Sequence, residues 1–225
     1  MEARLNKFLA EATGKSRREA DDLIAAGRVV VNGQIAKLGA RISEGRDAVL
    51  LDGSEISRPS KYTYLALNKP VDYLSSRRSQ GGDKTVYDLL PEKYKNLKLV
   101  GRLDKNSSGL ILLTDDGTFA FEMTHPKFVK QKIYNVTLDK PLEPLHAQMI
   151  ADFGVALEDG VSKFLLRRLA DDGLNWEVTM SEGRNRQIRR TFRALGYEVV
   201  GLHRISFGRY LLGGLKSGEF EEVSA

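Results

Sequence analysis

The segment from Leu97 to Gly117 carries the side chains best suited to acid, base or nucleophilic chemistry. It reads LKLVGRLDKNSSGLILLTDDG. In an extended stretch Arg102 and Asp104 point the same way while Leu103 points into the core. A carboxylate placed beside a guanidinium can serve as a nucleophile or as a general base. A second interpretation stays open at this point, because an aspartate in a turn commonly caps its own backbone.

A basic helix near the C-terminus could supply a cation for this carboxylate. Its arginines recur at i, i+3, i+4 and i+7 and form a stripe: Arg186, Arg189, Arg190 and Arg193. At ~100° per residue, Arg189 is one step from Ile188 and lies toward the apolar edge. We expect Arg189 to be buried beside Asp104. The alternative is that all four arginines form a solvated stripe that faces phosphates.

Apolar periodicity predicts the strands that must position these residues. Leu97 and Leu99 alternate with a lysine, and Leu110 to Leu113 is a continuous apolar run, so two strands are expected to flank the polar loop. A further strand is expected over Tyr62 to Leu67. Another covers Lys132 to Val136 and includes Tyr134, although a strand tyrosine commonly belongs to the core.

The first 56 residues read as helix, turn, helix and hairpin. Ser16 with Glu19 three residues later forms a capping box at the second helix, and Asn32-Gly33 is a strong signal for a tight hairpin turn. The polar stretch 57–61 then predicts a linker. We therefore expect a small domain over 1–56, a linker over 57–61 and a larger domain over 62–225.

Cations gather at the helix starts of the small domain. Arg4 and Lys7 fall at the first predicted helix, and Arg17 and Arg18 at the entry to the second. The helix dipole disfavours cations at such positions by ~0.3 to 1 kcal/mol. A ligand phosphate would remove this conflict, and a merely solvated helix start is the alternative.

Composition narrows the function classes. The 225 residues include no cysteine, which excludes disulfides and thiolate metal sites. The formal net charge is +5, and the stretch 181–209 alone holds seven arginines against two glutamates. This clustering favours a nucleic-acid partner. No apolar run approaches the ~18 residues of a membrane span, so we expect a cytoplasmic protein without a membrane partner. The three histidines lack metal-type spacing.

The small domain resembles the S-four type RNA-binding domain, named after a small-subunit ribosomal protein. The motifs that carry the resemblance are RLNKFL, SRREADDLI and GRVVVNG, in this order. The resemblance implies RNA binding.

The larger domain resembles bacterial rRNA pseudouridine synthases that carry such an N-terminal domain. GRLDKNSSGLILLTDDG is similar to their defining motif, and three more segments fit in the right order: LNKP at 67–70, KIYNV at 132–136 and EGRNRQIRR at 182–190. The resemblance implies an α+β fold in which a small α/β RNA-binding domain precedes a catalytic domain built on a mixed, mainly antiparallel sheet. It implies an isomerase that needs no cofactor or metal.

The resemblance also implies roles for single residues. Asp104 would be catalytic, Arg189 would pair with it, and Tyr134 would stack on the uracil or assist at its carbon 5. Arg102 would fill the gap left by a flipped nucleotide. Lys69 would contact phosphate or pack beside the site. The remaining predicted RNA contacts are Arg184, Arg186 and Arg190, together with Arg4, Lys7, Arg17 and Arg18 of the small domain.

A few points separate this chain from the family or stay open. Asp72 stands where the family often has glycine, and its charge could weaken RNA binding or alter substrate choice. The form of the last motif looks more like enzymes of large-subunit rRNA than of small-subunit rRNA.

We expect a monomer that acts on rRNA or on a ribosomal subunit assembly intermediate. The alternative function is a non-catalytic, rRNA-binding ribosome assembly factor. A glycoside-type hydrolase or a nuclease is a third possibility. The sequence does not favour it, because it shows neither a matched carboxylate pair at recognisable spacing nor a metal-binding cluster.

Overall fold

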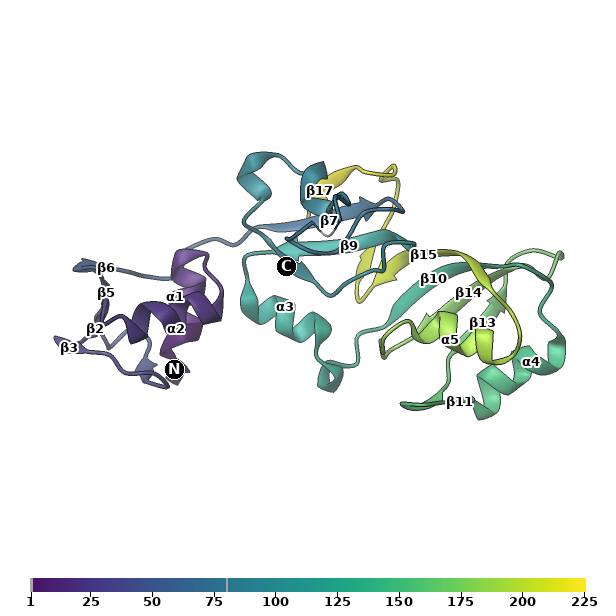
Figure 1. The fold of residues 1–225 in the computed structure, drawn as a ribbon, viewed down its shortest axis with the longest axis horizontal. Coiled ribbons are helices and arrows are strands. Elements are labelled where there is room, and N and C mark those ends of the chain that lie inside the picture. Colours follow the sequence, from purple (N-terminus) through teal and green to yellow (C-terminus); the bar gives the residue numbers. More distant parts are fainter. Residues whose placement is uncertain (1, 80) are drawn as a thin grey trace. The chain divides into compact units, whose positions relative to one another are not determined.

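The chain divides into two compact units. The computed structural model describes residues 2–79 and 81–225. The N-terminal unit extends to Thr63 and includes Asp115–Gly117, whereas the C-terminal unit comprises Tyr64–Thr114 and Thr118–Ala225 (Figure 1). Residues 57–61, predicted as a linker, group with the N-terminal unit. One reason is that the Arg58 guanidinium lies 2.8 Å from Glu11 and 2.9 Å from Glu44.

The N-terminal unit packs two helices with short strands. Its elements are β1 (Glu2–Arg4), α1 (Leu5–Thr13), α2 (Arg17–Ala25), β2 (Val29–Val31), β3 (Gln34–Ile35), β4 (Arg41–Ser43), β5 (Val49–Leu51) and β6 (Ser54–Glu55). Strands β3-β2-β5-β6 form an antiparallel sheet, and β1 pairs with β4. Apolar residues of both helices and of β2, β4 and β5 form its core.

Local signals decide where these elements begin and turn. The predicted capping box is confirmed, because the Glu19 amide donates to Ser16 Oγ at 3.2 Å and the Ser16 amide donates to Glu19 Oε2 at 2.7 Å. The predicted hairpin is confirmed as well: Asn32 and Gly33 join β2 to β3 with φ of 50° and 81°. Arg4 was expected on the first helix but precedes it in an extended conformation.

The C-terminal unit is built on one large sheet. Its strands are β7 (Tyr64–Lys69), β8 (Lys98–Val100), β9 (Ser108–Thr114), β10 (Lys132–Leu138), β13 (Leu165–Arg168), β14 (Asn175–Met180), β15 (Val199–Phe207), β16 (Tyr210–Leu211) and β17 (Phe220–Glu222). The order is β13-β14-β10-β15-β9-β7-β17, with β16 on β15 and β8 on β9. Only β9 and β15 run parallel within the described sheet. The predicted α+β class with a mixed, mainly antiparallel sheet is confirmed.

Helices and a hairpin complete this unit. They are η1 (Val86–Leu89), η2 (Glu92–Tyr94), α3 (Gly117–Thr124), η3 (Pro126–Phe128), α4 (Pro144–Gln148), η4 (Met149–Phe153), the hairpin β11 (Val155–Leu157) with β12 (Gly160–Ser162), and α5 (Gln187–Ala194). No helix in the described part of the chain is long and apolar enough to cross a membrane.

Strand β9 is buried on both faces. Ile111 and Leu113 belong to the main core, to which α5 contributes Ile188 and Phe192. Leu110 and Leu112 belong to a smaller core on the other face. Burial on both faces explains why the sequence of β9 is a continuous apolar run without polar alternation.

Candidate functional site

The loop between β8 and β9 holds Asp104. After β8 ends, Gly101 turns the chain with φ of 75°. Leu103 is buried, Arg102 is exposed and Asp104 is half-buried, as the predicted alternation requires. Ser75 holds the loop from outside, because its Oγ donates to the Leu103 carbonyl at 2.8 Å and accepts from the Leu103 amide at 3.2 Å. Ser75 therefore fixes both the amide and the carbonyl of Leu103, the residue before the Asp104 carboxylate.

The ionic partner of Asp104 is Arg186. Its Nη1 lies 3.0 Å from Asp104 Oδ2 and 3.3 Å from the Asn106 amide oxygen. The two charged side chains are 38% and 34% exposed, so this ion pair is open to solvent. The expected pairing of Asp104 with Arg189 does not occur in the structure.

The reason for this correction lies at the start of α5. The helix begins at Gln187, and Arg186 is its N-cap with a left-handed backbone, φ 47° and ψ 31°. Arg186 therefore leaves the helical stripe on which the sequence placed it. Non-glycine residues adopt this conformation rarely, at a cost of about 1 to 3 kcal/mol, and such strain clusters at functional sites.

Arg189 supports the loop from beneath. It is only 8% exposed. Its Nη1 donates to the Val199 carbonyl at 2.6 Å, and its Nη2 donates to the Asn106 carbonyl at 2.8 Å and to Ser107 Oγ at 3.2 Å. Burial lowers the pKa of Arg189, the Arg186 cation lowers it further, and the Asp104 charge opposes both effects. Arg189 is buried as predicted, but it connects the loop to β15 through the backbone.

Lys69, at the end of β7, lies under the same loop. Its side chain is fully buried, and Nζ donates to the carbonyls of Pro70 at 2.8 Å and Ser107 at 2.6 Å. Burial lowers its pKa to about 8, against the opposing charges of Asp104 and Asp72. Of the two expected roles, direct contact with RNA phosphate does not fit a 0% exposed residue. Packing beside the site does.

Tyr134 lies in the middle of β10, opposite Val178 of β14 and Arg204 of β15. The predicted strand is confirmed. The tyrosine is 8% exposed and belongs to the main core. Its role toward a uracil stays a prediction.

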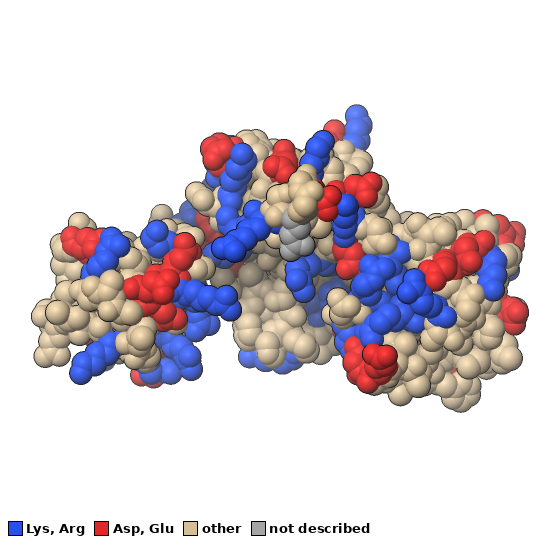
Figure 2. Space-filling model, viewed as in Figure 1, with Lys and Arg blue, Asp and Glu red and all other residues tan. Residues whose placement is uncertain are grey.

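Three arginines in and before α5 form ion pairs within the protein. Arg184 and Arg190 both bind the Asp159 carboxylate, at 2.9 Å and 2.7 Å, and Arg193 binds Glu198 at 2.9 Å. Figure 2 accordingly shows red side chains among the blue ones in this part of the surface. Arg184 also donates to three carbonyls of residues 159–161 and thereby holds the β11–β12 hairpin. Its predicted RNA contact would compete with these bonds.

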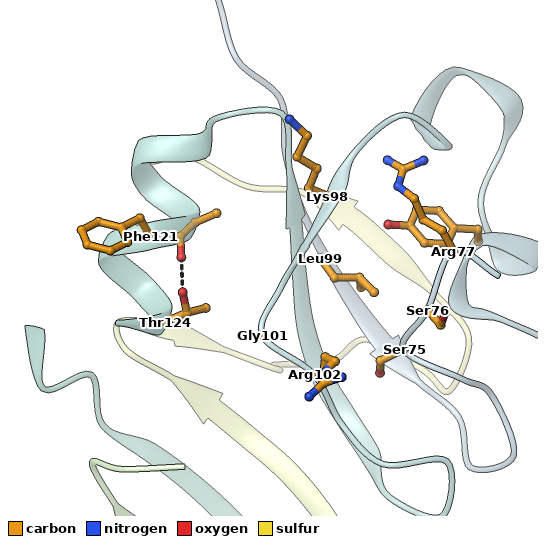
Figure 3. Close-up of a pocket in the computed structure, with 11 residues that line it drawn as sticks. Ser75, Ser76, Arg77, Lys98, Leu99, Gly101, Arg102, Phe121 and Thr124 are labelled. Carbon is orange, nitrogen blue, oxygen red and sulfur yellow. Dashed lines mark hydrogen bonds between the residues drawn. The ribbon is translucent and has the colours of Figure 1, made fainter. Parts of the chain in front are cut away.

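Arg102 lies at a cleft on the other side of the loop. The cleft is lined by Ser75, Ser76, Arg77, Tyr87, Lys98, Leu99, Gly101, Arg102, Ala120, Phe121 and Thr124 (Figure 3). No carboxylate lines it. Arg77 has a structural role, because its guanidinium donates to the three carbonyls of residues 95–97. Arg77 and Arg102 are both exposed at this cleft, and Arg102 is the one whose guanidinium an incoming RNA strand could meet without breaking the bonds of Arg77 to the backbone.

The cationic side chains of the N-terminal unit differ in their partners within the protein and in their exposure to solvent. Lys7 lies 3.8 Å from Glu11, and Arg17 donates to the Asn6 amide oxygen at 3.3 Å. Arg4 and Arg18 are exposed. The exposed members of this set remain available to a polyanion.

Three supporting residues were not found by sequence reasoning. Ser75 hydrogen-bonds the loop at Leu103, and the Asn106 side chain accepts a hydrogen bond from Arg186. Nothing in the local sequence of Ser75 or Asn106 indicates these contacts. Arg204, 2% exposed, donates from Nε to the Leu110 carbonyl at 2.7 Å and so ties β15 to β9. Asp72, which stands where the family often has glycine, has a φ of 65°. This left-handed conformation favours glycine, and aspartate tolerates it better than most residues do.

Fold and site together describe an RNA-modifying enzyme: a basic two-unit protein with a carboxylate held on a rigid loop. Residues 63–194 match the model of the RNA pseudouridylate synthase family, and residues 3–47 match that of the S4 domain. The chain belongs to the RNA pseudouridylate synthase family, and its N-terminal unit contains an S4 domain.

Individual relatives agree over nearly the whole chain. A Pasteurella multocida protein named ribosomal small subunit pseudouridine synthase A is 39% identical, over 99% of this chain and 96% of its own. A Bacillus subtilis protein named ribosomal large subunit pseudouridine synthase B is 35% identical, over 98% and 92%. A crystal structure of a pseudouridylate synthase has a TM-score of 0.70 and 34% identity, and the match covers 98% of this chain and 96% of that one.

Proposed function

We propose that this protein converts a specific uridine of rRNA, in the large subunit, to pseudouridine, with Asp104 as the reacting carboxylate. The observation that carries the proposal is the placement of Asp104. It stands half-exposed on a loop that is held by Lys69 of β7, Arg189 of α5 and Ser75 of a loop, with a guanidinium 3.0 Å away. Such support is what a reacting group needs to keep a productive geometry.

The chemistry requires a carboxylate and no redox step. The bond between ribose carbon 1′ and uracil nitrogen 1 breaks, the base rotates, and carbon 5 bonds to carbon 1′. Carbon 5 then loses its proton, and nitrogen 1 gains one. Asp104 would act either as the nucleophile at carbon 1′ or as the base toward the hydrogen at carbon 2′. Both routes need the carboxylate oxygen that the Arg186 guanidinium contacts at 3.0 Å.

Arg102 and Tyr134 would serve the same reaction. A uridine within folded RNA must be extruded before its base can rotate. Arg102, exposed two residues before Asp104, would fill the gap in the stack, and Tyr134 would contact the flipped base. Recognition of the surrounding RNA would come from Arg186 and Arg190 and from the exposed cations of the S4 domain.

The first prediction is that Asp104→Asn abolishes catalysis and preserves RNA binding. The variant removes the reactive oxygen, and loss of an exposed ion pair should cost less than about 1 kcal/mol of stability. Release of tritium from rRNA labelled at uracil carbon 5 measures the reaction, and filter binding measures affinity. Asp171→Asn, an exposed carboxylate in another loop, is the matched control. Release at the wild-type rate by folded Asp104→Asn protein would refute the role of Asp104.

The substrate is tested in cells. Pseudouridine mapping of both rRNAs, with and without this protein, should show one site lost from large-subunit rRNA. A site lost from small-subunit rRNA would correct the subunit and keep the chemistry. If wild-type protein binds rRNA and no site changes, the non-catalytic assembly factor is the better description.

A further inference from the structure

An aromatic cluster lies at the end of α3, and one of its members, Phe121, also lines the cleft of Arg102. We define the aromatic cluster as Phe121, His125 and Phe128. The Phe121 ring centroid lies 4.7 Å from that of His125 and 5.7 Å from that of Phe128. The Lys127 ammonium stands over both phenylalanine rings, 5.2 Å from the centroid of Phe121 and 4.6 Å from that of Phe128.

The cluster does not contribute to the core. Helix α3 already packs inward through Met123, which is 6% exposed, and through the partly buried Phe119 and Ala120. Phe121 is 46% exposed, and its ring points away from Leu99 and Arg102, on the other side of the helix (Figure 3). Phe121 and His125 are exposed and Phe128 is partly exposed. Aromatic rings that stay accessible together on one short segment indicate a binding surface.

The cluster is continuous with the catalytic loop. Phe121 and Arg102 line the same cleft, and a Cβ built on Gly101 would lie 3.7 Å from Thr124 of α3. A strand that passes Arg102 therefore needs to travel only around α3 to reach the rings. Within residues 118–131 the charged residues are Lys127, Lys130 and the single acid Glu122, so the local charge suits a polyanion.

We propose that the aromatic cluster is a stacking platform for an unpaired base of the substrate RNA, near the target uridine. This inference rests on the proposed function. An aromatic face accepts any base, and a neighbouring ammonium can contact the adjacent phosphate. The Lys127 ammonium, now over the rings, would turn to that phosphate and free a ring face for the base. Unpaired segments are the parts of folded RNA that proteins read in this way.

The second prediction tests the platform by affinity. Binding is measured in the Asp104→Asn background, which the first prediction expects to bind RNA without converting it. There we expect Phe121→Ala with Phe128→Ala to weaken binding to unmodified rRNA transcript about tenfold. The slope of log affinity against log salt should not change, because no phosphate contact is removed. Phe153→Ala, which removes a 76% exposed phenylalanine from η4, is the matched control and should bind normally. Phe121→Tyr keeps a stacking ring and should also bind normally.

Photocrosslinking locates the contact directly. Transcript carrying 5-iodouridine should crosslink to the peptide that contains Phe121 and Phe128, and the double alanine variant should lose this crosslink. Unchanged affinity of the folded double variant, or crosslinks that avoid this peptide, would overturn the proposal. So would a double variant that loses only self-association, since the cluster would then be a contact between copies of the chain. Because binding is measured without turnover, failure of the enzymatic proposal would show separately in the tritium assay.

Discussion

At the scale of single residues, two arginines divide the work around one carboxylate. Arg186 meets the Asp104 oxygen itself, whereas Arg189 meets the backbone that carries Asp104. The first contact is exposed and made by one nitrogen, so it is adaptable. The second contact is buried, and two nitrogens of Arg189 bind the carbonyls of Val199 in β15 and of Asn106 in the loop. An RNA phosphate could therefore draw Arg186 away without disturbing the loop.

The third prediction follows from this division. Arg189→Lys should lower the rate of pseudouridine formation by tenfold or more, because one ammonium cannot span the Val199 and Asn106 carbonyls; a lost hydrogen bond to a charged group costs ~1.5 to 3 kcal/mol. Arg186→Lys should lower it only a few-fold, since a point charge still reaches Asp104. Single-turnover rates at saturating RNA compare the two. The reverse order of effects would make Arg186 the essential arginine.

At the scale of elements, the site depends on the parallel junction between β9 and β15. The two strands are joined through Ser108 and Gly109 opposite His203 and Arg204. Gly109 has φ of 104°, and a Cβ there would lie 2.3 Å from the Arg204 carbonyl oxygen. Ser108 Oγ also lies 2.8 Å from His203 Nδ1. This close approach places the loop of Asp104 directly above the strand that follows α5.

The fourth prediction is that Gly109→Ala destabilises the C-terminal unit by about 3 kcal/mol or more. Overpacking costs ~1 to 3 kcal/mol and a left-handed backbone at alanine a further ~1 to 3 kcal/mol. Trp176, the single tryptophan of the chain, lies in β14 of this unit and reports its urea unfolding. Gly214→Ala, where a Cβ would meet nothing within 4 Å, is the control. Equal unfolding midpoints for the two variants would contradict the argument.

At the scale of the whole molecule, the candidate reacting group lies in one unit, whereas both units carry candidate RNA contacts. The residues around Asp104 all belong to the C-terminal unit, whereas the S4 domain contributes exposed cations at its helix starts. We propose that the S4 domain raises affinity for rRNA and takes no part in the reaction. Binding through phosphates releases counterions, so it should weaken as salt rises.

The fifth prediction separates the two contributions in the full chain. Replacing Arg4, Arg17 and Arg18 with glutamine should reduce the slope of log affinity against log salt by about 2 to 3, because each phosphate contact contributes ~0.7 to 0.9. The rate at saturating RNA should stay unchanged. Arg167→Gln, at an exposed arginine of β13, is the control for the loss of one surface arginine outside the S4 domain. An unchanged salt slope would mean that these cations do not touch RNA.

The sequence by itself determined the family, the α+β class and the loop that carries Asp104. It also predicted both helices and the first hairpin of the S4 domain, the strands β7 to β10 and helix α5. These features rest on local signals: apolar periodicity for β9 and α5, the capping box at Ser16, and the motif around Asp104. Only the tertiary structure decided which arginine meets the carboxylate. Residues 104 and 186 are 82 positions apart, and their contact depends on a left-handed backbone at Arg186 that a helical repeat does not anticipate. The tertiary structure likewise decided between the two roles expected of Lys69, because the distant carbonyls of Lys105 and Ser107 reach its Nζ only after the sheet has formed.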